Sequence, residues 1–319
     1  MKIVLIEDLA VSNEQIEQAK NNLKKQGHEL IYKPGMSKAK EQIDTLKDAD
    51  ILIIGNMPLH EEAIDKANNL KFIDVAFTGT DHIPVAAASK RNIPVSNASG
   101  YATEAVAELA LYAMIDLFRK IEPLQTAVRN SKTKTGIRGR LLNGKTVGIV
   151  GAGHIGSKTA QYAKALGAKT LGYCRHPKED PNIDQFVLLD QLLTESDIVS
   201  LHVPLNESTR HLISKEQFEL MKPDAFLINT ARGPVVDSAA LIDALNQKQI
   251  AGAALDVFDQ EPPLSKDDPL LSFDRDQLIL TPHIGFDSEE SMIARFNIVM
   301  DNLQAFLDGH PKNVVNNIN

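Results

Sequence analysis

The chain has 319 residues, 43% of them hydrophobic and 24% charged, a globular composition whose length predicts about two domains. Its formal net charge of −8 argues against a nucleic-acid partner, because no basic field is present to neutralise phosphates. The single cysteine excludes an internal disulfide and the short acidic start is unlike a signal peptide, so a cytoplasmic protein is expected. No apolar run is long enough to predict a membrane span.

Over the first hundred residues, short apolar runs alternate with helical patterns. A capping box of Ser12 and Gln15 opens an expected helix that ends at Gly27. This alternation predicts a doubly wound parallel sheet, and the lack of a phosphate-binding glycine motif favours a substrate domain. The expected strands are 2–6, 29–33, 51–54, 72–77 and 93–95, the last at a sheet edge because it contains proline, with further helices near 38–47 and 60–68.

Two polar loops that contain glycine, 54–57 and 77–81, follow strands of this expected sheet. Ligands bind at the carboxyl ends of parallel strands, so Asn56, Thr78 and Gly79 are candidate substrate-binding residues. Backbone N–H groups around Thr78 and Gly79 could hold a carboxylate. Simple turns that close a strand are the alternative interpretation.

A helix rich in strong helix formers is expected from residue 101 to residue 115, and from residue 109 to residue 118 it is apolar on nearly every face. Such a helix must be buried on all sides, which predicts packing against a second subunit in a homodimer. A long core helix within one chain is the alternative. The basic, polar stretch 129–140 has no periodicity and is interpreted as a connection rather than a nucleic-acid patch.

The most specific motif follows the apolar run 147–150, where Gly151, Gly153 and Gly156 have the spacing G-x-G-x-x-G. An amphipathic helix and a second strand, 169–173, come next, so the motif lies in a strand, turn, helix, strand unit. The three glycines would allow a tight turn, the close approach of a pyrophosphate, and helix packing on the strand. We therefore predict a dinucleotide-binding domain, with an ordinary glycine turn as the alternative.

The end of the strand 169–173 bears on coenzyme preference. NAD-dependent enzymes place an acidic residue about 20 residues beyond the glycines. Cys174 stands there instead, followed by Arg175 and His176. A guanidinium without a neighbouring carboxylate favours the 2′-phosphate of NADP, so NADP is predicted over NAD. Arg175 as a solvated surface charge is the alternative.

Four further strands, expected at 197–201, 225–229, 251–257 and 278–280, each end in a polar cluster. These clusters are expected to converge on one crevice at the carboxyl edge of the sheet. They comprise His202 to Pro204, Thr230 to Gly233, Asp256 to Glu261, and Thr281 to His283.

Arg232, Glu261 and His283 are the residue types that reversible hydride transfer to a 2-keto acid requires. A guanidinium can bind a carboxylate at two points, and a histidine can donate a proton near neutral pH. A carboxylate behind the histidine fixes its tautomer. Each residue also has a structural alternative: a salt bridge for Arg232, a loop carboxylate for Glu261 and a buried hydrogen-bonded ring for His283.

The segments 151–156, 228–233, 255–262 and 281–285, together with 200–205 and 106–108, resemble the D-isomer-specific 2-hydroxyacid dehydrogenases. The resemblance implies an α/β fold of two doubly wound parallel-sheet domains. A Rossmann cofactor domain, 101–287, would be inserted into a flavodoxin-like substrate domain, 1–100 plus 288–319. It also implies a homodimer, with Arg232 binding substrate, His283 as the acid–base and Glu261 supporting it.

The expected cofactor contacts combine the glycine motif, the strand ends and the resemblance. They are Gly151, Gly153, His154, Ile155, Gly156, Cys174, Arg175, His202, Pro204, Thr209, Thr230, Ala231, Arg232, Asp256, His283 and Gly285. Two residues depart from the family pattern: Cys174 replaces the usual aspartate, and Phe286 stands where a small residue is common, which predicts a different pocket wall.

Members that resemble phosphoglycerate dehydrogenase carry an arginine in the loop matching Asn56 and Met57 and often a regulatory domain, and this sequence shows neither. Small keto acids with uncharged tails, such as glyoxylate, hydroxypyruvate or pyruvate, are therefore favoured, and phosphoglycerate dehydrogenase activity is the alternative. A nucleotide-sensing corepressor has the same fold, but the complete Arg, Glu and His set favours an enzyme. The scattered histidines predict no metal site.

Overall fold

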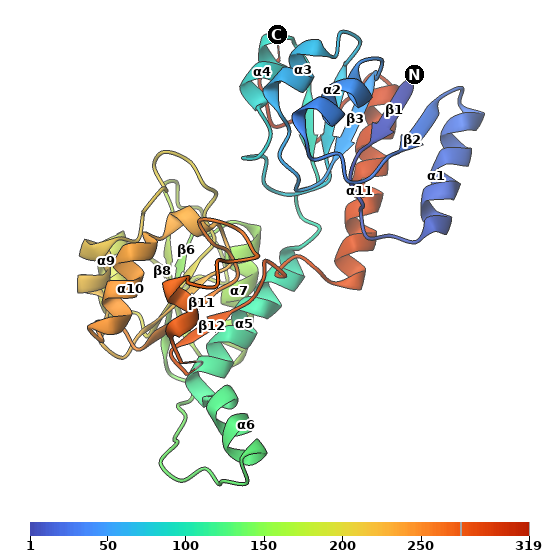
Figure 1. The fold of residues 1–319 in the computed structure, drawn as a ribbon. Helices are drawn as coiled ribbons and strands as arrows, with labels where there is room; N and C mark the ends of the chain where they lie inside the picture. The colour runs from blue at the N-terminus through green and yellow to red at the C-terminus, as the bar shows by residue number, and fades with distance from the viewer. Residues whose placement is uncertain (275, 319) are drawn as a thin grey trace. The chain divides into compact units, whose positions relative to one another are not determined.

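The computed structural model describes residues 1–274 and 276–318, and the chain forms two compact units (Figure 1). The first unit comprises Met1–Ala102 and Asp287–Asn319, and the second comprises Thr103–Phe286. Each unit contains one parallel sheet with helices on both faces. The predicted fold class of two doubly wound parallel-sheet domains is therefore confirmed.

The first unit has a five-stranded sheet in the order β2-β1-β3-β4-β5, and every pairing is parallel. The strand expected at a sheet edge, β5, does lie there. Most strand ends differ from the expected ones by one or two residues, because hydrogen bonding rather than hydropathy sets them. The strands are β1 (Lys2–Leu5), β2 (Glu29–Tyr32), β3 (Ile51–Ile54), β4 (Phe72–Val75) and β5 (Val95–Asn97).

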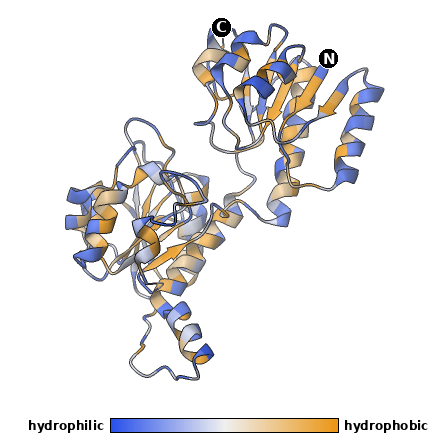
Figure 2. Ribbon diagram, viewed as in Figure 1, coloured by the Kyte–Doolittle hydropathy of each residue, from blue (hydrophilic) through white to orange (hydrophobic). Residues whose placement is uncertain are grey.

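Helices of the first unit at 13–25, 39–46 and 61–66 lie where they were expected, whereas those at 85–90 and 289–307 were not predicted. Ser12 and Gln15 form the predicted capping box, in which the Ser12 hydroxyl accepts from the Gln15 N–H at 3.2 Å. Figure 2 shows apolar strands in both sheets and a largely hydrophilic outer face on α1. The helices are α1 (Asn13–Lys25), α2 (Ala39–Leu46), α3 (Glu61–Lys66), α4 (Val85–Lys90) and α11 (Glu289–Leu307).

Helix α11 covers strand β4 although the two are far apart in sequence. The rings of Phe72 and Phe306 stack with centroids 4.4 Å apart. The Asn302 amide donates to the Asp74 carboxyl at 3.0 Å, and burial raises the pKa of this Asp74 carboxyl well above its usual value. The last helix is therefore part of the core of the first unit.

The second unit has a seven-stranded parallel sheet in the order β12-β11-β10-β9-β6-β7-β8. The two-residue edge strand β8 has too few residues to give a sequence pattern and was not predicted. The strands are β6 (Thr146–Val150), β7 (Lys169–Tyr173), β8 (Gln185–Phe186), β9 (Ile198–Leu201), β10 (Phe226–Asn229), β11 (Gly252–Leu255) and β12 (Leu278–Leu280).

Two apolar cores cover the two faces of this sheet. Residues of α5 and α7 pack on one face and residues of α8, α9 and α10 on the other. Helix α6 projects from the body of the unit (Figure 1). The helices are α5 (Thr103–Arg119), α6 (Ile121–Arg129), α7 (His154–Ala165), α8 (Leu189–Glu195), α9 (Lys215–Leu220) and α10 (Ser238–Asn246), with 3₁₀ turns at Gly233–Val235 and Pro269–Ser272.

Within the apolar stretch 109–118 of α5, Tyr112 is the one exposed residue of the single chain, and the covering of this face by a second subunit stays a prediction. Glu104, Glu108 and Tyr112 form an exposed stripe along α5, at intervals of four residues that place them on one face. The alanine-rich composition between them hides this narrow stripe from a hydropathy pattern. The buried residues of α5, including Met114 and Phe118, pack into the core of the second unit.

Among the described residues, no helix is both long enough and apolar enough to cross a membrane.

Candidate active site

The three glycines of the loop after β6 differ in how much space surrounds the position that a Cβ would occupy. Gly151 has φ +99°, and a Cβ there would lie 2.7 Å from the carbonyl carbon of His202. A Cβ at Gly156 would lie 2.1 Å from the carbonyl oxygen of Gly151. At Gly153, by contrast, no atom lies within 4 Å of the Cβ position, so the backbone is open to a ligand.

Helix α7 begins directly after this open position. Its first hydrogen bond runs from the Ser157 N–H to the Gly153 carbonyl at 2.8 Å, so the N–H groups of the preceding helical residues point out of the helix. These free donors and the positive end of the helix dipole suit an anionic pyrophosphate. The loop therefore fits the dinucleotide that its sequence predicts.

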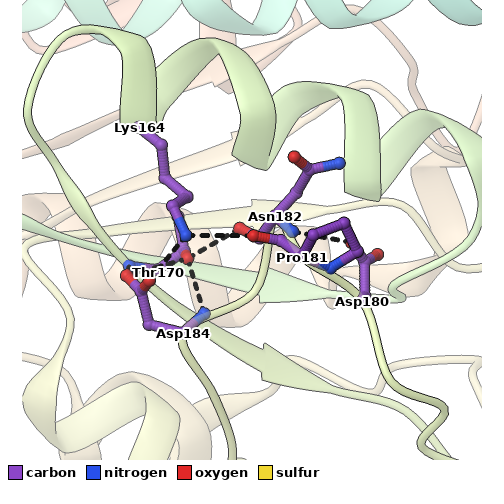
Figure 3. Close-up of polar contacts among 6 residues, drawn as sticks. All are labelled: Lys164, Thr170, Asp180, Pro181, Asn182 and Asp184. Atoms are coloured by element: carbon purple, nitrogen blue, oxygen red, sulfur yellow. Dashed lines mark hydrogen bonds and ion pairs between the residues drawn. The ribbon is translucent and has the colours of Figure 1, made fainter.

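The segment after β7 carries the residues that bear on coenzyme choice. Cys174 is partly buried, and the exposed Arg175 guanidinium makes no hydrogen bond or ion pair with any described residue. The far end of the segment is fixed, as Figure 3 shows. Lys164 on α7 donates to the Asp184 carboxylate at 2.6 Å and to the Pro181 carbonyl at 3.1 Å.

Asp184 also binds strand β7. Its carboxylate accepts from the Thr170 N–H at 2.8 Å, and the Thr170 hydroxyl donates to the Asn182 carbonyl at 2.8 Å (Figure 3). The Lys164 ammonium lowers the pKa of the Asp184 carboxyl. The loop that carries Arg175 is therefore attached to both α7 and β7, while Arg175 itself is free to meet a ligand.

At the end of β9, His202 is held by Ser200, whose hydroxyl oxygen lies 2.9 Å from the His202 Nε2. The His202 Nδ1 is buried and has no hydrogen-bond partner among the described residues. Burial lowers the pKa of His202 to about 3, so the ring is neutral at physiological pH. A buried ring nitrogen without a partner is suited to a ligand or an ordered water molecule.

Because the folded-state pKa of His202 is depressed, the native state resists protonation and loses stability as pH falls below about 6.5. Between pH 7 and pH 5, the free energy of unfolding of the wild type should fall by about 1–2 kcal/mol more than that of His202→Asn. Urea unfolding at both pH values measures this difference. The exposed-site variant His310→Asn serves as the control, and parallel pH profiles for wild type and His202→Asn would contradict the interpretation.

Pro204 and Thr209, two expected cofactor contacts, bind each other. The Thr209 hydroxyl donates to the Pro204 carbonyl at 2.6 Å and accepts from the Asn206 N–H at 2.8 Å. The Thr209 hydroxyl is therefore engaged within its own loop, where it closes the turn that follows β9.

The loop after β10 is shaped by Asn229, which sequence reasoning did not select. Its side chain accepts from the Ala231 N–H at 3.0 Å and donates to the Arg232 carbonyl at 2.9 Å. The Arg232 guanidinium in turn donates to the Ala231 carbonyl at 2.8 Å. The available signal was a buried polar residue at the last position of a strand. The neighbouring Thr230 hydroxyl oxygen is buried and has no partner among the described residues.

Asp256, at the end of β11, fixes the next loop. Its carboxylate accepts from the Thr281 hydroxyl at 2.6 Å and from the N–H groups of Ile284 and Gly285 at 2.9 Å and 2.8 Å. Burial raises the pKa of the Asp256 carboxyl. Asp256 was expected to touch the cofactor, and the structure shows it binding the turn that carries His283.

His283 lies in that turn with φ +56°, a left-handed conformation that side chains rarely adopt. Its Nδ1 lies 3.3 Å from the Glu261 carboxylate, and its ring meets the Phe286 ring edge-on at 5.6 Å. The structure thus joins two of the three proposed catalytic residues. Arg232, the third, follows β10, which is the neighbour of β11 in the same sheet.

Besides Arg232 of the second unit, the candidate substrate residues are Asn56, Thr78 and Gly79, which lie in the first unit. Thr78 and Gly79 follow β4, and their N–H groups have no hydrogen-bond partner among the described residues. Asn56 follows β3, and its N–H already donates to the Glu7 carboxylate at 2.9 Å. Within residues 1–274 and 276–318, no group of three or more His, Cys, Asp or Glu side chains is placed to hold a metal ion.

Comparison with known proteins identifies the family. Residues 111–285 match the model of the D-isomer specific 2-hydroxyacid dehydrogenase, NAD binding domain. The chain belongs to this family. It is 39% identical over 283 residues to a glycerate dehydrogenase from Methylorubrum extorquens, covering 86% of this chain and 88% of the relative. Other relatives are named hydroxypyruvate reductase, glyoxylate reductase and D-3-phosphoglycerate dehydrogenase.

Solved structures agree with this assignment. An acyclic imino acid reductase in complex with NADPH and D-Arg superposes with a TM-score of 0.89 at 31% identity, covering 99% of this chain and 100% of that one. A D-lactate dehydrogenase from Aquifex aeolicus, complexed with NAD and lactic acid, gives 0.85 at 31% identity, with coverage of 97% and 96%. The chain is a D-2-hydroxyacid dehydrogenase, an oxidoreductase that acts on a CH–OH group with a nicotinamide coenzyme.

Proposed function

We propose that this dehydrogenase interconverts small 2-keto acids with uncharged tails, such as glyoxylate or hydroxypyruvate, and their D-2-hydroxy acids. The observation that carries the proposal is the contact of 3.3 Å between His283 Nδ1 and the Glu261 carboxylate at the carboxyl edge of the sheet. A histidine oriented by a carboxylate is the arrangement that proton transfer to a carbonyl oxygen needs. The loop that carries Arg232 lies at the same edge.

The bound nicotinamide coenzyme supplies the hydride in reduction and accepts it in oxidation. Arg232 binds the substrate carboxylate and polarises the neighbouring carbonyl. Because the His283 Nδ1 faces Glu261, the proton is transferred at Nε2, to the carbonyl oxygen in reduction and from the hydroxyl in oxidation. Glu261 holds the ring orientation and stabilises the protonated imidazole.

Thr78 and Gly79 are proposed to bind the substrate carboxylate. The support is that both residues lie in the loop at the carboxyl end of β4 and that their N–H groups have no hydrogen-bond partner among the described residues. The Thr78 carbonyl accepts from the Asn97 amide at 2.7 Å, so the loop is anchored while its donors stay available. Asn56 would contact substrate only through its exposed side chain.

We propose NADP as the preferred coenzyme. The glycine loop and the N-terminus of α7 would hold the pyrophosphate, and Arg175 would bind the 2′-phosphate. The support for this preference is the unpaired Arg175 guanidinium on a loop that Lys164 and Asp184 anchor, together with Cys174 at the position where NAD-dependent enzymes carry an acid.

Arg175→Ala should raise the KM for NADPH by about 10–100-fold, because one charge-assisted contact to a phosphate is lost. The KM for NADH should change little, since NADH has no 2′-phosphate. Steady-state kinetics with each coenzyme measures both values, and Lys178→Ala removes an exposed cation from the same loop as a matched control. Equal changes for NADPH and NADH would show that Arg175 does not bind the 2′-phosphate.

We also propose a cytoplasmic homodimer. Tyr112 on α5, Val128 on α6 and Leu141 in the segment before β6 are uncovered, at 50%, 72% and 66% exposure. The single cysteine fits a reducing compartment. Sedimentation equilibrium should give twice the mass of one chain. A measured mass equal to that of one chain would contradict the proposed homodimer.

The proposed activity is tested by following NADPH and NADH oxidation with a panel of 2-keto acids. Reduction of glyoxylate or hydroxypyruvate with NADPH as the better coenzyme is the expected result. Preferred reduction of 3-phosphohydroxypyruvate would support the phosphoglycerate alternative. A protein that binds NADH but reduces no acid would point to the corepressor-like role.

A further inference from the structure

One carboxylate in the first unit is bound by a set of backbone donors at the end of a neighbouring strand. Glu7 follows β1, and the loop Gly55 to Met57 follows β3. The Glu7 carboxylate accepts from the N–H groups of Gly55, Asn56 and Met57 at 2.8, 2.9 and 3.0 Å, using both oxygens. Such a set of converging N–H groups is an anion-binding loop, and here a side chain of the same chain fills it.

The loop is built around this contact. A Cβ at Gly55 would lie 2.7 Å from the Glu7 carboxyl carbon, so glycine leaves room for the carboxylate. On its other side, His82 Nε2 lies 2.7 Å from the Gly55 carbonyl oxygen and donates to it. The loop is therefore fixed in the conformation that presents its donors to Glu7.

The position of this contact in the sheet gives it significance. In the order β2-β1-β3-β4-β5, the chain connections reverse direction between β1 and β3. Ligands of open parallel sheets bind outside the carboxyl ends of the strands at such a switch point, and anionic groups commonly use backbone donors there. Glu7 places a negative charge at this point and uses the donors that a ligand anion would need.

The neighbouring loop differs. Strand β4 lies beside β3, and the Thr78 and Gly79 N–H groups that follow β4 are unpaired within the described residues. Neighbouring strands lie about 4.8 Å apart, so a substrate carboxylate held at Thr78 and Gly79 would lie one strand away from the loop 55–57. Glu7 itself follows β1, two strands from β4, but its carboxylate is held at this 55–57 loop. The described residues of the first unit thus include one set of free N–H donors, at Thr78 and Gly79, that can bind an anion. Beside it is a second set, at residues 55–57, whose donors already bind the Glu7 carboxylate.

From these contacts we propose that Glu7 is a specificity residue that selects 2-keto acids with neutral or cationic tails and rejects anionic tails. Glu7 withholds the donors of residues 55–57 from a substrate anion and repels it by like charge. This inference rests on the proposed reductase function, whose substrate class it narrows. Phosphorylated and dicarboxylic keto acids are the substrates that it excludes.

The test compares two acids of matched shape, 4-methyl-2-oxopentanoate and oxaloacetate, whose tails end in an isopropyl group and a carboxylate. The wild type should favour the first in kcat/KM by about tenfold or more, less at high salt. Glu7→Gln keeps the side-chain size and removes the charge, and it should reduce this preference by about tenfold. Glu62→Gln removes an exposed carboxylate from α3 of the same unit and should leave the preference unchanged.

The ratio of the two substrates separates selection from mere support of the loop. If Glu7→Gln lowers kcat/KM for both acids in parallel, or if the wild type has no preference, Glu7 only holds the loop and the proposal is overturned. Calorimetric binding of the product analogues D-2-hydroxyisocaproate and D-malate gives the same comparison without turnover. A wild type that reduces neither acid but binds the neutral one more tightly would refute the reductase proposal alone, whereas equal binding would refute the role of Glu7.

Discussion

Replacing His283 with alanine should lower kcat by about 10²–10⁴-fold while coenzyme binding survives. The variant removes the group that donates the proton to the carbonyl oxygen, and Glu261, 3.3 Å from Nδ1, is left without the ring that it orients. The turn itself should persist, because the Asp256 carboxylate holds the Ile284 and Gly285 N–H groups independently of the imidazole. Turnover is measured with a keto acid in excess, and coenzyme binding by fluorescence titration.

His310→Ala is the matched control, since it removes an exposed imidazole that follows α11. It should leave kcat unchanged. An unchanged kcat in His283→Ala would refute the assignment of His283 as the acid–base, and so would a loss of coenzyme binding large enough to account for the lost turnover.

Gly233→Ala should destabilise the second unit by about 1–3 kcal/mol or more and lower kcat/KM by about 10²-fold. A Cβ at Gly233 would lie 1.9 Å from the carbonyl carbon of Phe258 and 2.5 Å from the Asp259 nitrogen. These are backbone atoms that no rotamer change can move away. The backbone must therefore separate, and it carries Arg232 on one side and leads to Glu261 on the other.

The stability effect is measured by urea unfolding and the kinetic effect with saturating coenzyme. Gly153→Ala is the control for stability alone, because its added methyl group meets no atom within 4 Å. The prediction is contradicted if the unfolding free energies of Gly233→Ala and Gly153→Ala agree within about 0.5 kcal/mol. Such agreement would show that the close contact with Phe258 relaxes at little cost.

Local patterns predicted much of the fold. The Ser12 and Gln15 capping box, the alternating strands and the tight turn at Gly151 each depend on residues close together in sequence, and each was confirmed. The roles proposed for Arg232, Glu261 and His283 stay predictions, although the structure does join His283 to Glu261.

What the sequence did not predict depends on long-range contacts. Glu7 meets loop donors 48 to 50 residues away, and no periodicity encodes such a pairing. Asp256 also binds the Thr281 hydroxyl and the N–H groups of residues 284 and 285, contacts that no sequence pattern predicted, and its expected contact with a cofactor stays a prediction. Polar residues at strand ends can bind either a ligand or a neighbouring loop, and only coordinates separate these two roles.

The discontinuous first unit also determines the order in which the nascent polypeptide can mature. Strand β4 emerges from the ribosome more than 200 residues before its stacking partner Phe306 and its hydrogen-bond partner Asn302. Thr103–Phe286, an uninterrupted stretch, can close its own core before then. We therefore expect the sheet around β4 to lack its cover until α11 has been synthesised, an interval in which it needs protection from aggregation.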